Sequence, residues 1–246
     1  MILQKLDITP KALKLLNSGS LWIFSNEIKQ KLKGLIPGSL AEFVCQGRYV
    51  GVGYVNPHSL IAGRILSREP VSDWARFFMD RFESANQRRG PLKSRGSYRA
   101  VFSEADHVPG LIVDLYIRKN GQTTLVVQST TAGMDQLREF WQAALIEVFK
   151  PQSLVLRADS HIRHLEQVEL FSEVILGQKE DLQDGELLED GLYFAADFVE
   201  GQKSGFFLDQ KENRLSLRNL IQKDSQGVDL CSYSGAWGMK IGRAHV

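Results

Sequence analysis

The spacing of hydrophobic and polar positions changes along the chain, and each change predicts a different kind of structure. Thr9 followed by Pro10 predicts a helix start, because Thr is a favoured N-cap and Pro fits the first helical turn. Short apolar runs follow at 40–44, 49–55 and 60–66, separated by Pro-Gly, Gln-Gly and Asn-Pro turns. Short strands at this spacing are typical of a small β-barrel module of about 70 residues.

From residue 71 the pattern alternates between helical and extended spacing. Apolar residues recur at helical spacing over 71–88 and 134–149, and Pro151 ends the second helix. A loop of basic residues, Gly, Pro and Ser is expected at 89–97. Apolar runs predict four strands, at 98–102, 111–116, 123–128 and 153–156. This order predicts a second, α+β domain.

The next segment combines a hairpin with a dense group of polar residues. Alternation around Asp190-Gly191 predicts the hairpin. Asp209 with Glu212 three residues later predicts a capping box that opens an amphipathic helix. A capping box and a buried Phe206 do not explain why further polar residues crowd around them: Gln202, Lys203, Gln210, Asn213 and Arg214.

An apolar run at 227–231 predicts a short buried strand, and small residues follow directly at 232–238. Doubly wound α/β folds use such a strand and turn to bring the backbone close to a nucleotide-like ligand. An ordinary strand-to-helix connection explains the pattern equally well. The segment lacks the glycine pattern of dinucleotide-binding folds, the P-loop pattern and the serine nucleophile elbow. Cys231, within the predicted strand, is expected to be an inert core thiol.

Composition excludes several classes of protein. The 246 residues are 43% apolar with a net charge of +1, which excludes a disordered chain. The chain has two cysteines, Cys45 and Cys231, too few and too far apart for a disulfide scaffold. No apolar run reaches the roughly 18 residues needed to span a bilayer, and no signal pattern opens the chain. We therefore expect a cytoplasmic protein without membrane partners.

The small net charge conceals an asymmetry that points to a polyanionic partner. Residues 1–100 contain 16 Lys and Arg against 7 Asp and Glu (+9), and residues 101–246 contain 14 against 22 (−8). A solvated linker and loop would also explain the basic residues, but basic side chains among turn formers are suited to phosphates. The candidate RNA-binding residues are Lys29, Lys31, Lys33, Arg88, Arg89, Lys93 and Arg95.

Two other groups of side chains invite a catalytic or metal-binding interpretation. Glu104 and Asp106 form a carboxylate pair, but no third ligand lies at useful spacing, so a polar turn before a buried strand is favoured. His161 and His164 lie three residues apart with no cysteine nearby, and such pairs are usually structural. No metal site is therefore expected.

Taken together, four segments resemble the bacterial class I S-adenosylmethionine (SAM)-dependent rRNA methyltransferases with an N-terminal PUA domain. The similarity is greatest to the large-subunit rRNA cytosine-C5 methyltransferases, and its clearest segments are 102–106, 109–114, 201–214 and 229–235. The resemblance implies a mixed α/β and α+β protein of three parts. These are a PUA-like RNA-binding β-barrel (1–70), a middle α+β domain (71–175) and the start of a Rossmann-like methyltransferase domain (176–246).

The resemblance also implies SAM as cofactor and ribosomal RNA as substrate. Carried onto this sequence, the cofactor-binding positions are Phe206, Asp209, Gln210, Asp229, Ser232, Tyr233 and Gly235. In the implied reaction a cysteine thiolate attacks pyrimidine C6, which makes C5 nucleophilic toward the methyl group of SAM.

The family places its catalytic cysteine well downstream of the 229–235 motif. We therefore expect a C-terminally truncated chain without catalytic residues, inactive in methyl transfer. We also expect the native sequence to end near Lys240, because residues 241–246 resemble one reading frame of a sequencing adapter. A stand-alone RNA-binding module is the alternative function. A nucleotide-dependent oxidoreductase is disfavoured by the missing glycine pattern.

Overall fold

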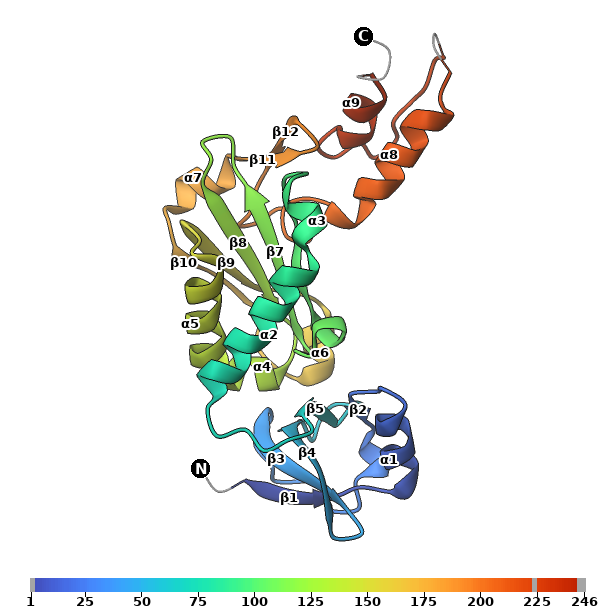
Figure 1. Ribbon diagram of the computed structural model, residues 1–246, viewed down its shortest axis with the longest axis vertical. Helices are drawn as coiled ribbons and strands as arrows, with labels where there is room; N and C mark the ends of the chain where they lie inside the picture. Colours follow the sequence, from blue (N-terminus) through green and yellow to red (C-terminus); the bar gives the residue numbers. More distant parts are fainter. Residues whose placement is uncertain (1–2, 223–224, 243–246) are drawn as a thin grey trace.

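The described part of the chain forms two five-stranded sheets and a two-stranded hairpin, which follow one another along the long axis of the molecule (Figure 1). The computed structural model describes residues 3–222 and 225–242. The expected mixed α/β fold class is confirmed by this architecture. Part of the suspected adapter segment, 243–246, lies outside the described residues.

The first sheet is built from the short N-terminal runs in the order β1-β3-β4-β5-β2, with β1 and β3 parallel and the other pairs antiparallel. Helix α1 (Pro10–Asn17) begins as predicted, because the Thr9 side chain accepts a hydrogen bond from the Ala12 N–H at 3.2 Å. A 3-10 turn (Ser25–Glu27) follows β2. The strands are β1 (Gln4–Asp7), β2 (Trp22–Ile23), β3 (Ser39–Cys45), β4 (Arg48–Val55) and β5 (Gly63–Ser67).

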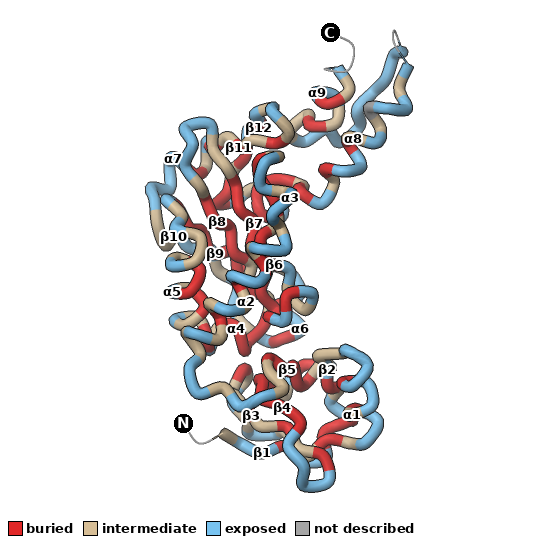
Figure 2. Tube along the Cα trace, viewed as in Figure 1, coloured by how far each residue is buried: buried red, intermediate tan, exposed pale blue. Residues whose placement is uncertain are grey.

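The second sheet has the order β10-β9-β8-β7-β6, and only β8 and β9 are parallel. Its strands are β6 (Tyr98–Phe102), β7 (Leu111–Ile117), β8 (Thr123–Ser129), β9 (Ser153–Ala158) and β10 (Phe171–Leu176). Helices α2 (Trp74–Arg88) and α5 (Arg138–Phe149) cover one face, and the buried residues concentrate in the strands beneath them (Figure 2).

The opposite face of this sheet is covered by the C-terminal part of the chain. Successive side chains of a strand point to opposite faces, so Leu125 and Val127 join the core under α2 and α5. Val126 instead packs with Phe194 and Phe206 in a second core. Burial on both faces explains why these strands are continuous apolar runs. The covering elements are α7 (Lys179–Gln183), β11 (Gly185–Glu189) and β12 (Leu192–Ala196).

The first sheet docks on the second unit through buried polar contacts. The Tyr54 hydroxyl donates to the Pro109 carbonyl oxygen at 2.8 Å. Asn56 donates to the Glu166 carbonyl and carboxylate oxygens at 2.8 and 2.9 Å, and Arg64 pairs with the same carboxylate at 2.9 Å. These groups lie between elements more than 50 positions apart, so they join the two parts in one orientation.

Most of the predicted elements are confirmed, and three boundaries need correction. The run predicted as a strand from residue 60 becomes a strand only at Gly63. The basic loop predicted at 89–97 contains a one-turn helix, α3 (Gly90–Lys93). The single helix predicted over 134–149 is divided at Leu137 into α4 (Ala132–Gln136) and α5. The remaining short elements are α6 (Ile162–Glu166) and a 3-10 turn at Ser103–Asp106.

Candidate functional site

A cavity of about 310 Å³ lies where the polar block after the hairpin meets the small-residue turn. Its walls come from a loop at 203–207, the start of α8 (Lys211–Leu220) and the turn that leads into α9 (Ala236–Gly242). The lining residues are Lys203, Phe206, Phe207, Gln210, Arg214, Cys231, Ser232, Tyr233, Ser234, Ala236 and Trp237. The cavity therefore combines aromatic side chains with hydroxyl, amide and cationic groups.

The loop on one side of the cavity is held by the second sheet. The Ser204 hydroxyl donates to the buried Asp114 carboxylate at 2.5 Å, and Arg99 pairs with the same carboxylate at 2.8 Å. Gly205 has φ +103°, and a Cβ there would lie 2.7 Å from the Asp197 carbonyl oxygen, so the position requires glycine. The sheet thus determines where this wall of the cavity lies.

The facing wall is a turn with left-handed backbone at two non-glycine residues, Cys231 (φ +61°) and Tyr233 (φ +50°). The Tyr233 hydroxyl donates to the Gly205 carbonyl oxygen at 3.2 Å. Its ring meets the Phe207 ring edge to face, with 5.7 Å between the centroids. One aromatic side chain therefore closes the cavity between the two segments.

The cavity brings together four of the seven predicted cofactor residues: Phe206, Gln210, Ser232 and Tyr233. Asp209 lies beside it and pairs with the lining residue Lys203 at 2.9 Å. Burial raises the pKa of Asp209, but the hydrogen bond and charge of Lys203 outweigh it and hold the pKa below its usual value.

The other two predicted positions lie elsewhere. Asp229 lines a different cavity, of about 580 Å³, together with apolar residues that include Leu217 and Ile221. Gly235 (φ +68°) lies in the turn but does not line the 310 Å³ cavity.

The predicted capping box is wrong. A 3-10 turn (Leu208–Gln210) precedes the helix, which starts at Lys211, and Gln210 is its N-cap residue. The Asp209 carboxylate binds Lys203, and Glu212 pairs with Arg95 at 2.7 Å. The long-range partners took both carboxylates, which the local pattern assigned to the helix N-terminus.

The predicted buried strand at 227–231 is also wrong. No strand is assigned to these residues, and Val228 and Leu230 are 85% and 82% exposed. Cys231 is exposed, so it is no core thiol. A strand is stabilised by its neighbours, and the described residues place no other strand beside this segment.

The sequence pattern missed a buried ionic cluster behind the cavity. Arg214 and Glu189 are both fully buried and their side chains lie 2.5 Å apart, while Lys240 lies 3.7 Å from the same carboxylate. Lys240 also pairs with Asp190 at 3.3 Å. These contacts join α8 and α9 to the hairpin. Polar residues on a strand of alternating pattern were the available signal, but they predict a solvated face as readily.

The structure separates the predicted RNA-binding residues into free and paired groups. Lys31 and Lys33 line a groove of about 610 Å³ with His58, whereas Lys29 pairs with Asp7 at 2.9 Å. Lys93 lies exposed in α3. The three arginines form ion pairs: Arg88 and Arg89 with the buried Asp106, and Arg95 with Asp190.

Asp106 and Glu104 have the structural roles that the sequence favoured. Burial raises the pKa of Asp106, but hydrogen bonds from the two arginines and the Phe102 N–H hold it below the usual value. Glu104 accepts from the Trp22 indole N–H at 2.8 Å. Over residues 3–222 and 225–242, no group of three His, Cys, Asp or Glu side chains is placed to hold a metal ion. Within the same residues, no helix is long and apolar enough to cross a membrane.

Comparison with known proteins provides the family. A sequence profile of the PUA-like domain matches residues 6–68. The chain is 30% identical over 225 residues to ribosomal RNA large subunit methyltransferase I of Yersinia pseudotuberculosis serotype O:1b. It is 29% identical over 222 residues to that of Vibrio parahaemolyticus serotype O3:K6. The chain is homologous to these methyltransferases. Each match covers 89% of this chain and 54% of the relative, so the chain spans about half the length of these proteins.

Solved structures agree on the fold. A candidate SAM-dependent methyltransferase from Streptococcus mutans superposes with a TM-score of 0.79 at 20% identity, over 99% of this chain and 61% of that one. A methyltransferase solved in complex with S-adenosylhomocysteine (SAH) has a TM-score of 0.78 at 20% identity, over 99% of this chain and 60% of that one. The homologous chain therefore shares its arrangement of elements with methyltransferase structures.

Proposed function

We propose that this protein methylates large-subunit ribosomal RNA with SAM as the methyl donor. The observation that carries the proposal is the 29–30% identity to rRNA large subunit methyltransferases over 89% of the chain. The PUA-like match at 6–68 and the excess of basic residues before residue 100 support an RNA substrate. We propose the three-part division at 1–70, 71–175 and 176–246 and a cytoplasmic location with it.

The residues around the 310 Å³ cavity are suited to SAM. The volume is at the lower end of the range for small-molecule sites, roughly 300–1,000 Å³. Tyr233 and Trp237 offer aromatic faces for the adenine, and Ser232 and Gln210 offer hydrogen bonds for the ribose or the amino-acid group. Lys203 is a cation that complements the ligand carboxylate. SAM, when bound, supplies an electrophilic methyl group.

We propose as cofactor-binding residues the set Phe206, Asp209, Gln210, Asp229, Ser232, Tyr233 and Gly235. Four of them line the cavity, and Asp209 orients the lining residue Lys203. The left-handed backbone at Gly235 supports a role in shaping the turn rather than in touching the ligand.

Cytosine C5 is the proposed methylation target, through attack of a cysteine thiolate on C6. We assign that thiolate to neither cysteine of this chain. Cys45 is buried in the first sheet, and Cys231 lies in the turn where the resemblance implies cofactor contacts. We therefore propose that the 246-residue chain binds SAM but does not transfer its methyl group on its own.

Calorimetric titration of the chain with SAH tests the cofactor site. Binding to the unaltered chain is expected, and Tyr233→Ala should weaken it by about tenfold, because base–aromatic stacking contributes about 1–3 kcal/mol. Gln210→Ala should weaken it several-fold through a lost hydrogen bond. Ser216→Ala, at an exposed position of α8 outside the cavity lining, is the matched control. Equal affinity in all three variants would contradict the site.

Nucleoside mass spectrometry tests the reaction itself. Large-subunit rRNA from source cells that lack this gene should be missing one 5-methylcytidine that the parent cells contain. A different missing methylated nucleoside would replace the cytosine assignment, and identical rRNA from both cells would overturn the proposed function.

A further inference from the structure

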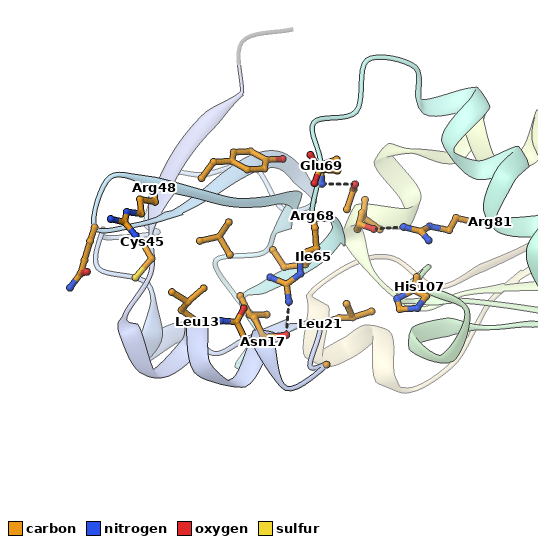
Figure 3. A pocket seen from close by; sticks show the side chains of 17 residues that line it. Leu13, Asn17, Leu21, Cys45, Arg48, Ile65, Arg68, Glu69, Arg81 and His107 are labelled. Carbon is orange, nitrogen blue, oxygen red and sulfur yellow. Dashed lines mark hydrogen bonds between the residues drawn. The ribbon is translucent and has the colours of Figure 1, made fainter.

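A second cavity, of about 790 Å³, opens at the junction of the first sheet with helix α2. Its lining comes from the end of α1, the turn between β3 and β4, strand β5, helix α2 and His107. Figure 3 shows Arg48 and Cys45 at one end of the cavity and Arg81 and His107 at the other. None of the candidate RNA-binding residues inferred from the sequence lines it.

Two arginines, one from each side of the junction, lack an acidic partner. Arg68 donates to the Leu16 carbonyl oxygen at 2.5 Å, and Arg81 donates to the Leu66 carbonyl oxygen at 3.4 Å. Over residues 3–222 and 225–242, neither guanidinium forms an ion pair, although every nearby arginine from Arg64 to Arg99 does so. A half-buried cation without a carboxylate is suited to an incoming anion.

Electrostatics support the same interpretation. Burial lowers the pKa of Arg68, and burial together with the charge of Arg88 lowers that of Arg81. Both effects express the cost of holding a positive charge here, and a bound anion would remove that cost. His107 has its pKa lowered by burial and by the charges of Arg81 and Arg88, so its ring is neutral near pH 7 and can exchange hydrogen bonds with a base or ribose.

The remaining lining suits a nucleotide base better than a simple ion. Leucine and isoleucine side chains from α1 and β5 form an apolar part of the wall, and Tyr49 exposes 39% of its surface beside them. Aromatic and apolar surface beside cationic side chains is the pattern with which proteins bind single-stranded RNA, whose unpaired bases stack while phosphates are neutralised. The volume exceeds what an inorganic anion needs.

We propose that this junction cavity binds an unpaired nucleotide of the RNA substrate, with its phosphate between Arg68 and Arg81. The inference rests on the proposed function, because it takes RNA as the substrate. Each arginine comes from a different part of the chain, so the site exists only while the first sheet stays docked through Tyr54 and Glu166. The cavity would then place the RNA relative to the rest of the enzyme.

The test measures binding of a fluorescently labelled single-stranded RNA oligonucleotide to the full chain by anisotropy, across a series of salt concentrations. Arg68→Gln and Arg81→Gln should each weaken binding by at least about tenfold and reduce the slope of log K against log salt by about 0.7, the value for one single-strand phosphate contact. Arg76→Gln is the matched control, because Arg76 lies on the same helix as Arg81, is exposed and pairs with Asp80 at 2.7 Å. It should change affinity less than about twofold.

Two further arms keep the outcome decisive. Arg81→Lys retains the charge and should recover part of the affinity, which separates a phosphate contact from damage to the packing of Arg81 on the Phe77 ring. Adenosine monophosphate should bind far more weakly than the oligonucleotide, and equal affinity would reassign the cavity to a free nucleotide. RNA binding that is equal in Arg68→Gln, Arg81→Gln and Arg76→Gln would overturn the inference. It would leave the proposed function standing, because SAH binding and rRNA methylation are measured separately.

Discussion

Replacing Glu189 by glutamine is expected to release α8 and α9 from the hairpin. The Glu189 carboxylate is completely buried, and it lies 2.5 Å from Arg214 and 3.7 Å from Lys240, which are buried as well. In the variant Lys240 keeps Asp190 at 3.3 Å, but Arg214 keeps only the Phe207 carbonyl oxygen at 3.1 Å. The lasting defect is therefore one buried guanidinium without a counter-charge.

The magnitude follows from that defect. Removing one partner of a buried ion pair typically costs about 3–5 kcal/mol, because the other charge stays desolvated. Each 1.4 kcal/mol is a factor of ten in an equilibrium. Hydrogen exchange of the α8 amides should accelerate by at least about a hundredfold, whereas exchange in β7 and β8 should change little.

Two variants provide the controls for this experiment. Glu186→Gln removes a carboxylate from the same strand, but its partner Lys119 lies at 3.6 Å and both side chains are largely exposed. Such a pair contributes about 0–1 kcal/mol, so exchange should change less than about fivefold. Glu189→Gln combined with Arg214→Met leaves no unpaired guanidinium and should restore much of the protection. If Glu189→Gln behaves like Glu186→Gln, the ionic cluster does not hold α8 in place.

Three further outcomes are expected. Tyr54→Phe should destabilise the chain by about 1–3 kcal/mol in urea unfolding, because the Pro109 carbonyl oxygen loses a buried donor; an unchanged midpoint would contradict this. Asp106→Asn should lower stability at neutral pH. Because the folded-state pKa of Asp106 is depressed, its contribution is present above the unfolded pKa of about 3.9 and is lost as pH falls further. The gap between Asp106→Asn and the unaltered chain should therefore narrow on acidification, and a constant gap would refute the assignment. Gly205→Ala should weaken SAH binding and lower the melting temperature, since its Cβ would meet the Asp197 carbonyl oxygen at 2.7 Å; unaltered SAH affinity would show that the loop is tolerant.

Local pattern was sufficient where each residue's role depends on its neighbours in sequence. The helix start at Thr9, the hairpin at Asp190-Gly191 and the strands at 123–128 and 153–156 all formed as predicted. Periodicity and turn chemistry act over a few residues, so these elements can be read from the chain. Four of the seven predicted cofactor positions also line one cavity, because the motifs at 201–214 and 229–235 fold against each other.

Only the tertiary structure decided which charged groups are free and which extended segment becomes a strand. Arg88 and Arg95 resemble free phosphate ligands in sequence, yet their acidic partners Asp106 and Glu212 lie 18 and 117 positions away. The apolar run at 227–231 stays exposed because a strand depends on hydrogen-bonding neighbours that its own residues do not provide. The unpaired Arg68 and Arg81 become one site only when the first sheet docks beside α2. Partner identity is a long-range property, and the local order of residues does not contain it.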